Sequence, residues 1–267
     1  MKPLIEKSRI FLQNAKSICI LTGAGISAES GLKTFRDAGG LWEDHAIEKV
    51  ATPEGFAEDP RLVWEFYNAR RKAAHKATPN AAHLALSRLE QGRRHRAKQK
   101  GKPTQGNGNG AAHRVPEPLT LLTQNIDGLH QQAGSKNVIE LHGSIWKVRC
   151  TGCGVVSSEF PIELPILPHC EKCGKLLRPH VVWFGESLES DVLDAAETAI
   201  EECDLFLVIG TSAVVQPAAS YPFLAARRGV PVIEVNKEKT PVTAVAVLSL
   251  QGLAGEILPK IIPPLPL

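Results

Sequence analysis

Hydrophobic residues in this chain form short runs that alternate with longer stretches of helical spacing. The runs at 17–22, 119–123 and 205–209 are mostly apolar, as in strands buried on both faces. Three further runs are at 138–141, 232–235 and 244–248. Stretches with apolar residues along one helical face are at 4–16, 60–77, 188–203 and 217–228. The alternation predicts an α/β fold, a doubly wound parallel sheet with helices on both faces.

A further helix is predicted to start at Thr78 and Pro79, because the first turn of a helix tolerates the missing N–H of proline. This helix is expected to end near Gln91. The segment 92–116 is then rich in Gly, Asn, Pro, Lys and Arg and has few large apolar residues. Such a segment buries too little surface to offset its ordering entropy, so a disordered basic loop is predicted.

Composition and charge add few constraints. The chain has 267 residues, 43% hydrophobic and 22% charged, which is typical of a globular protein that buries its own core. Seven Lys and Arg residues lie in 92–116, so the net charge of +3 conceals a slightly acidic remainder and indicates no nucleic-acid partner. Neither a signal segment nor an apolar run of about 18 residues is present, so a cytoplasmic protein without a membrane anchor is expected.

Four of the six cysteines form two Cys-x-x-Cys pairs, and their positions are Cys150, Cys153, Cys170 and Cys173. Sixteen residues separate the pairs, a spacing typical of zinc sites in which each turn aims two thiolates at one ion. Four thiolates leave no position for water, so the predicted Zn²⁺ is structural. Unligated thiols or a redox pair are the alternatives, with His169 as a less favoured ligand. Cys19 and Cys203 are expected in the core.

A glycine turn follows the first apolar run. Its sequence, Gly23-Ala-Gly25-Ile-Ser-Ala28, resembles the dinucleotide-binding fingerprint, with alanine in the third position. A tight strand-to-helix turn without a ligand explains the same residues equally well. An ordinary dehydrogenase fits poorly, because the acids at the required distance, Glu43 and Asp44, do not follow a second strand.

Longer motifs cover nearly the whole chain. They are 23–31 (GAGISAESG), 34–36 (TFR), 123–130 (TQNIDGLH), 140–143 (ELHG), the two cysteine pairs, 182–186 (VWFGE), 210–212 (GTS) and Asn236. In this order they resemble the signature of the sirtuin family. The basic segment 92–116 is the one clear departure, because relatives usually have a short link there.

The resemblance implies an NAD-dependent protein-lysine deacylase. In that reaction an acyl-lysine oxygen attacks the ribose carbon of NAD, and nicotinamide, free lysine and O-acyl-ADP-ribose are released without hydride transfer. Acylated proteins are then the partners, and NAD is consumed as a co-substrate. The residues that the resemblance assigns to NAD are Gly23, Ala24, Gly25, Ser27, Phe35, Arg36, Gln124, Asn125, Asp127, Gly210, Thr211, Ser212, Asn236, Lys237, Glu238 and Ala254.

His142 is the predicted general base, because an imidazole near neutrality can accept a proton from a ribose hydroxyl. Without the surrounding motifs, a histidine at a strand end is more often a hydrogen-bonded structural residue. Asn125 and Asp127 correspond to positions that hold the nicotinamide amide, and Gln124 to a ribose contact. An Asx turn that caps a helix over 127–133 is the alternative for Asn125 and Asp127, and both roles are compatible.

Tyr67 and Arg70 are three residues apart on the predicted helix and so project to one side. In the sirtuin branch that removes succinyl, malonyl and glutaryl groups, a Tyr-x-x-Arg pair grips the acyl carboxylate, which suits the fork of arginine. A solvated helix face is the alternative, because Arg71 and Lys72 follow. The residues assigned to substrate are Ala38, Tyr67, Arg70, Val182, Phe184, Gly185 and Glu186, with 213–216 as the second edge of a peptide site.

Two other functions remain open. A protein ADP-ribosyltransferase on the same fold would modify an acceptor protein instead of forming O-acyl-ADP-ribose. A non-enzymatic zinc module that docks to nucleic acid through the basic segment is the second. The predicted organisation is one catalytic domain over 1–267, a zinc-binding module at 143–187 and a helical excursion at about 36–77. A monomer is expected.

Overall fold

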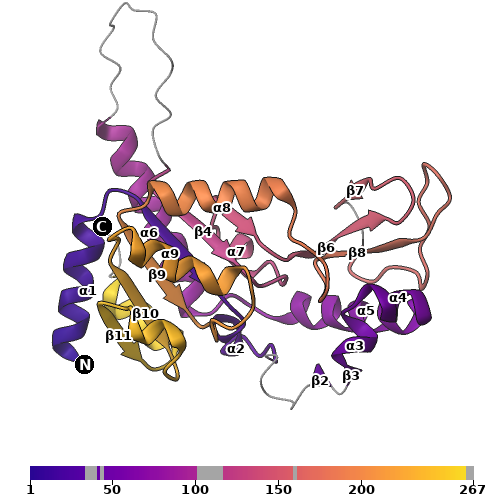
Figure 1. Ribbon diagram of the computed structural model, residues 1–267, viewed down its shortest axis with the longest axis horizontal. Helices are drawn as coiled ribbons and strands as arrows, with labels where there is room; N and C mark the ends of the chain where they lie inside the picture. The colour runs from indigo at the N-terminus through magenta and orange to yellow at the C-terminus, as the bar shows by residue number, and fades with distance from the viewer. Residues whose placement is uncertain (34–40, 43–44, 101–116, 159–160, 263–267) are drawn as a thin grey trace, which may run out of the picture.

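The computed structural model describes residues 1–33, 41–42, 45–100, 117–158 and 161–262 (Figure 1). Six parallel strands form its central sheet in the order β11-β10-β9-β1-β4-β5. Their bounds are β1 Ile18–Thr22, β4 Leu119–Thr123, β5 Val138–Glu140, β9 Leu205–Ile209, β10 Val232–Asn236 and β11 Leu248–Gln251. The strand order reverses at β1, which pairs with β4 on one side and β9 on the other. Open α/β sheets bind ligands at such a point, beyond the carboxyl ends of the strands.

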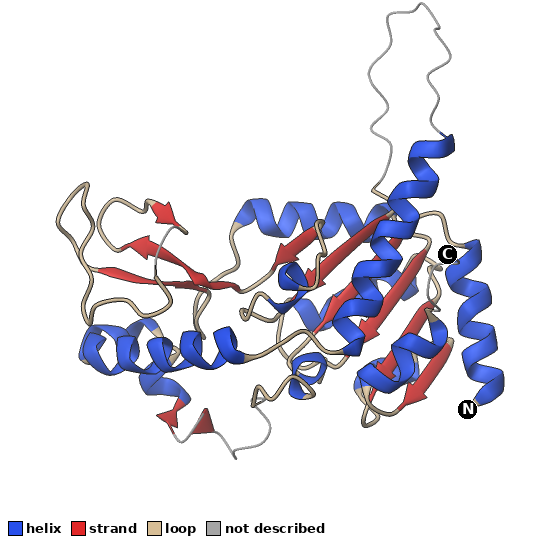
Figure 2. Cartoon of the chain, turned by 180° about the vertical axis from the view of Figure 1, so that it is seen from behind, coloured by secondary structure: helices blue, strands red, loops and turns tan. Residues whose placement is uncertain are grey.

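Helices cover both faces of this sheet, because the side chains of its buried strands alternate between two cores. Ile18 and Ile20 belong to one core, and Cys19 and Leu21 to the other. The first face is covered by α1 Lys2–Asn14, α6 Ala81–Lys100 and α10 Ala254–Ile261 (Figure 2). The second is covered by α8 Ser190–Glu202 and α9 Tyr221–Arg227 (Figure 1). The predicted doubly wound fold is confirmed.

A smaller body lies at one end of the sheet (Figure 1). Its antiparallel strands are β6 Gly143–Cys150, β7 Val156–Ser157 and β8 Leu177–Val181. Its other elements are β2 Leu41–Trp42, β3 His45–Ala46, α3 Ile47–Val50, α4 Pro53–Glu58 and α5 Pro60–Lys76. Trp64 and Tyr67 from α5 share one buried core with Ile145 of β6 and with Trp183. The helical excursion and the cysteine-bearing strands therefore pack as a unit with a core of its own.

Most predicted elements agree with the structure to within two residues at each end. The stretch 217–228 begins as a 3-10 helix, η1 Ala218–Ser220, before α9. The predicted strand at 244–248 is wrong: the chain forms a 3-10 helix, η2 Pro241–Ala244, and the strand begins at Leu248. Buried Glu234 is the physical reason, because its carboxylate accepts the hydroxyls of Thr240 and Thr243 at 2.5 and 2.6 Å and holds the turn.

The start of α6 also differs from the prediction. The helix begins at Ala81, beyond Thr78 and Pro79. The Asn80 side-chain oxygen accepts the N–H of Ala82 at 2.9 Å, which satisfies a donor of the first turn. Side-chain capping by asparagine therefore outweighs the proline signal. Two short helices, α2 Gly25–Ala28 and α7 Leu129–Gln132, follow the first and fourth strands.

The predicted end of α6 near Gln91 is wrong, because the helix continues to Lys100. Residues 92–100 of the expected disordered loop are thus helical, and 101–116 lie outside the described residues. Arg93 gives the reason: it is only 9% exposed and donates to the carbonyl oxygens of Leu12, Ala15 and Pro118 at 3.1, 2.5 and 2.8 Å. Arg93 was predicted to be a solvated residue of the basic loop, but its hydrogen bonds instead connect α6 to the end of α1.

Candidate functional site

A cavity of about 660 Å³ is lined jointly by the central sheet and the smaller body. The segments after β1, β4, β9 and β10 contribute to it from the sheet, and α5 and the segment after β8 from the smaller body. The described residues predicted for NAD, the substrate and the base that line it are Gly23, Ala24, Gly25, Ser27, Tyr67, Arg70, Gln124, Asn125, Asp127, His142, Val182, Phe184, Gly185, Glu186, Gly210, Thr211, Ser212, Asn236, Lys237, Glu238 and Ala254. Phe35, Arg36 and Ala38 lie outside the described residues.

Two glycine turns pack against each other at the sheet end of this cavity. Gly25 donates its N–H to the carbonyl oxygen of Gly210 at 2.8 Å, so the turns after β1 and β9 touch through their backbones. A Cβ on Gly25 would lie 2.7 Å from that oxygen, and one on Gly23 would lie 2.7 Å from the Thr211 side chain. Gly210 itself has a φ of 59°. These glycines are therefore required by the protein's own packing as well as by any approach of a cofactor.

Ser27 is the centre of a buried polar network. Its hydroxyl donates to a carboxylate oxygen of Asp127 at 2.8 Å and accepts from the amide of Asn125 at 3.0 Å. The other oxygen of Asp127 accepts the N–H of Leu129 at 2.9 Å, at the start of α7. Burial raises the pKa of Asp127, and these hydrogen bonds oppose the rise. The Asx-turn interpretation of Asp127 thus holds, and the residue faces the cavity at the same time.

Two histidines that the sequence prediction overlooked support this network from behind. His83 accepts the N–H of Asn80 at Nδ1, 3.3 Å away, so its proton is on Nε2, which lies 3.4 Å from Ser27 Oγ. His130 Nε2 lies 3.0 Å from Thr22 Oγ1, and the two rings are 4.9 Å apart. Burial lowers the pKa of His83 to about 4 and that of His130 to about 3. Both are neutral near pH 7, and single histidines in a sequence carry no sign of such a pairing.

His142 has the geometry of a general base. Its Nδ1 lies 3.1 Å from the carbonyl oxygen of Gln124, which can only accept, so Nδ1 carries the proton. The lone pair is then on Nε2. Burial lowers the pKa of His142, and the hydrogen bond to Gln124 partly counters this. Gln124 is fixed in turn by a bond from its amide to Thr211 Oγ1 at 2.9 Å.

Tyr67 and Arg70 line the cavity from the smaller body, on the same face of α5 as predicted. Tyr67 is fully buried and Arg70 is 8% exposed. Burial raises the pKa of Tyr67, so the phenol stays protonated across the physiological range. A cationic fork and a neutral hydroxyl at the end of a cavity suit a carboxylate.

The alternative of a solvated helix face is wrong for this part of α5. Arg71 is 1% exposed and donates to three main-chain carbonyl oxygens, two of them at 2.7 Å, on Pro161 and Ile162. The third belongs to Ile145 of β6. Asn68 brackets Leu164 with two hydrogen bonds, at 2.8 and 3.1 Å. The polar side chains of α5 thus bind the loop between the two cysteine pairs.

The rim of the cavity carries exposed apolar side chains on two sides. Phe184 is 45% exposed on the segment after β8, and Val214 is 65% exposed on the segment after β9. These are the two segments predicted to hold an extended peptide. Cavity residues that the sequence prediction missed include Ala51, Ile126, Val181 and Trp183. Ile126 and Trp183 lie within the motifs at 123–130 and 182–186, whereas Ala51 and Val181 lie outside every motif and reach the site only through the fold.

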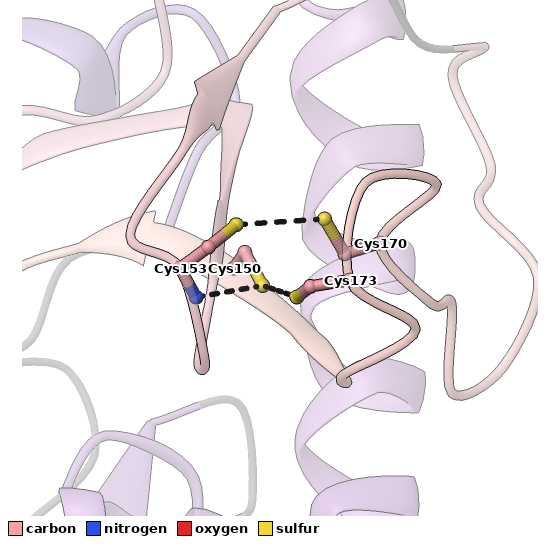
Figure 3. Close-up of side chains that lie close together, drawn as sticks. All are labelled: Cys150, Cys153, Cys170 and Cys173. Carbon is pink, nitrogen blue, oxygen red and sulfur yellow. Dashed lines mark hydrogen bonds between the residues drawn. The ribbon is translucent and has the colours of Figure 1, made fainter.

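The four predicted zinc ligands come together in the smaller body (Figure 3). All four sulfur atoms lie within 4.8 Å of one another, with Cys150 Sγ 3.3 Å from Cys173 Sγ and Cys153 Sγ 3.8 Å from Cys170 Sγ. These separations fit four thiolates around one tetrahedral Zn²⁺. None of the six cysteines is joined in a disulfide. His169 bonds instead to the Gly174 carbonyl at 3.0 Å.

Comparison with known proteins agrees with this geometry. The sequence profile of the Sir2 family matches residues 23–104 and 113–217. An NAD-dependent protein deacylase from Aquifex aeolicus is 48% identical over 246 residues, 92% of this chain and 93% of that protein. The NAD-dependent protein deacylase sirtuin-5, mitochondrial, of Danio rerio is 44% identical over 92% of this chain and 82% of its own length. The crystal structure of a Sir2 homolog–NAD complex superposes with a TM-score of 0.81 at 44% identity, covering 96% and 92% of the two chains.

This chain therefore belongs to the Sir2 family. The unmatched residues 105–112 fall inside the basic segment that sets the sequence apart. Among the helices in the described parts of the chain, none has the length and apolar character to span a membrane.

Proposed function

We propose that this protein removes acyl groups from lysine side chains of other proteins at the expense of NAD, and that it accepts acetyl and short dicarboxylic acyl groups. The observation that carries the proposal is the place of His142 in one cavity between two unlike walls. One wall consists of the glycine turns and the Asn125–Asp127 network. The other consists of Tyr67 and Arg70.

The first wall suits NAD. Gly23, Gly25 and Gly210 have no side chains, so a ligand can approach the backbone closely there. They lie where the strand order of the sheet reverses, which is where dinucleotides bind in such sheets. Asn125 and Asp127, held through Ser27, face the cavity and suit the amide of nicotinamide. Attack of the acyl oxygen on the ribose carbon releases nicotinamide from this wall.

His142 then serves as the base. Because its Nδ1 proton is held by the Gln124 carbonyl, Nε2 is the atom that takes a proton from a ribose hydroxyl. Its lowered pKa keeps the ring neutral and able to accept at pH 7. The deprotonated hydroxyl attacks the carbon of the O-alkylated amide, and a water molecule adds to the same carbon. The bond from this carbon to the lysine nitrogen breaks, so lysine leaves as the free amine and the acyl group stays on a ribose oxygen.

The second wall suits the acyl chain. Tyr67 and Arg70 are buried, as a carboxylate-reading pair must be to compete with water. The four cysteines would supply all four ligands of a Zn²⁺, so the ion's role would be to stabilise the fold of the smaller body.

The test is an incubation of matched acetyl-lysine and succinyl-lysine peptides with and without NAD, followed by mass spectrometry. NAD-dependent loss of both acyl groups with formation of O-acyl-ADP-ribose is expected. Consumption of NAD without deacylation of either peptide would instead favour ADP-ribosyl transfer to a protein.

Arg70→Met tests the acyl wall separately. The variant keeps an unbranched apolar stem and loses the guanidinium fork, so desuccinylation should fall about 100-fold more than deacetylation. Steady-state kcat/KM for the two peptides measures the difference. Equal losses would show that Arg70 has no part in reading the carboxylate.

A further inference from the structure

Trp183 connects the two substrate elements of the smaller body. It precedes the exposed Phe184, yet it is only 3% exposed and lines the cavity. Its indole N–H donates to the hydroxyl oxygen of Tyr67 at 2.9 Å. The ring centroids are 6.4 Å apart, with Phe56 on another side of the indole at 5.3 Å. The predicted acyl-reading tyrosine and the predicted peptide edge thus meet through one side chain.

The indole ring is held from its face by Arg178. The guanidinium carbon of Arg178 lies 3.4 Å from the centre of the ring, and its nitrogens reach both carboxylate oxygens of Glu186 at 2.5 and 2.9 Å. Although burial alone would raise the pKa of Glu186, these bonds and the Arg178 charge hold it below its ordinary value. The pair therefore stays ionised at pH 7, and the stack persists.

The backbone of Trp183 is fixed by the same carboxylate. The N–H of Trp183 donates to Glu186 at 2.9 Å, and the N–H of Glu186 returns to the Trp183 carbonyl at 3.0 Å. With its backbone and ring face both held, the indole N–H has a defined direction. It points to the Tyr67 oxygen.

This bond determines what Tyr67 offers a ligand. An indole N–H only donates, so the Tyr67 oxygen is the acceptor, and the remaining role of its hydroxyl proton is donation. A carboxylate accepts and never donates, and so it matches that polarity. The methyl group of an acetyl chain cannot accept a hydrogen bond from the Tyr67 hydroxyl.

We propose that Trp183 is a positioning residue for acyl selectivity, which orients the Tyr67 hydroxyl toward the carboxylate of a dicarboxylic acyl group. The inference rests on the proposed function, in which Tyr67 and Arg70 read that carboxylate. Through Arg178 and Glu186, the same residue ties the acyl-reading wall to the edge predicted to bind the peptide.

Trp183→Phe is the test, because it removes the N–H and keeps an aromatic ring under Arg178. The full chain is assayed at saturating NAD with succinyl-lysine and acetyl-lysine versions of one peptide. The ratio of kcat/KM for succinyl over acetyl should fall about tenfold, as for one misdirected hydrogen bond to a charged group. The change should appear in the KM of the succinyl peptide, because the contact is made in the ground state as well.

Trp64→Phe is the matched control. Trp64 is equally buried in the same core and donates its N–H to the Leu177 carbonyl at 2.9 Å, but it does not line the cavity. This variant should lose stability and keep the succinyl-to-acetyl ratio. In a Tyr67→Phe background, Trp183→Phe should cause no further change in the ratio, because it acts through the hydroxyl.

Two results would overturn the inference. One is an unchanged succinyl-to-acetyl ratio in Trp183→Phe, with or without an equal loss of both activities, and the other is a full effect that persists in the Tyr67→Phe background. Failure of the proposed function looks different, because the unaltered protein would then remove acetyl groups and leave succinyl groups in place. The inference would fall with it in that case.

Discussion

The two walls of the cavity are built in opposite ways. On the NAD side, short residues at strand ends bring main chain against main chain, and Gly25 and Gly210 touch through a 2.8 Å hydrogen bond. On the acyl side, large side chains from α5 and the segment after β8 interlock through rings and charges, as Tyr67, Trp183 and Arg178 do. The first wall tolerates no added atom, and the second depends on side-chain partners far apart in sequence. His142 lies where the two walls meet.

The largest effect on activity is expected from changing His142, because the reaction of every acyl substrate depends on it. His142→Asn removes the base and should lower kcat/KM about 10²- to 10⁴-fold with acetyl and succinyl peptides alike. The melting temperature should change little, because among the described residues the ring has a single hydrogen-bond partner, the Gln124 carbonyl. His169→Asn, which alters an exposed histidine, is the control. A loss restricted to one peptide would mean that His142 acts in acyl recognition instead.

The next effect concerns the stability of the smaller body, which carries the acyl wall. Arg71→Met leaves three carbonyl oxygens without their donor and should lower the free energy of unfolding by about 3 kcal/mol. Urea denaturation followed by circular dichroism measures it. Arg61→Met on the same helix is the control, because that side chain is 64% exposed and its ion pair with Glu65 spans 3.7 Å. Similar losses in the two variants would contradict the burial argument.

Adding a methyl group to the NAD wall by Gly25→Ala should impair the use of NAD without changing acyl selectivity. The Cβ of Gly25→Ala would meet the Gly210 oxygen at 2.7 Å and push the two turns apart. Because displacements of this size misplace a bound substrate, kcat/KM for NAD should fall about 100-fold. NAD titrations with each peptide measure it, and the succinyl-to-acetyl ratio should stay constant. A changed ratio would show that the walls are not independent.

The smallest effect concerns the buried histidines behind the NAD wall. The pKa of His130 is about 3 in the folded chain and 6.5 when exposed, so the folded state binds fewer protons. Stability is therefore full above pH 6.5 and is lost as the pH falls toward 3. At pH 5 the cost is about 2 kcal/mol relative to pH 7. His130→Gln should lose that much less between the two pH values in urea denaturation, and parallel losses would contradict the assignment.

The sequence predicted the NAD wall better than the acyl wall, and the reason is locality. The apolar run of β1 and the Gly23–Gly25 turn are adjacent in the chain, so one short window holds both the strand and its turn. Tyr67 and Arg70 also share one window. The residues that support Tyr67 do not share that window: Trp183, which bonds to its hydroxyl, and Ile145, which belongs to the same core, lie far along the chain.

The burial of charged side chains was the property that the sequence predicted least well. Arg71 and Arg93 look like surface residues in the sequence, yet they are 1% and 9% exposed. Arg71 binds carbonyl oxygens of the loop between the cysteine pairs, and Arg93 binds those at the end of α1, and these contacts exist only after folding. The wrong end of α6 has the same origin, since the anchor at Arg93 is supplied by α1 and not by its own segment.

By itself the sequence determined the doubly wound sheet, the four-cysteine cluster and the membership of the glycine, Asn125–Asp127 and His142 motifs in one site. Strand periodicity, turn chemistry and ligand spacing each depend on residues that are close together in the chain, so they can be recognised in the sequence alone. The tertiary structure alone decided the tautomers of His83 and His142, the burial of Arg71 and Arg93, and the contact of Trp183 with Tyr67. Hydrogen-bond direction and desolvation depend on which distant atoms become neighbours, and only the folded chain specifies them.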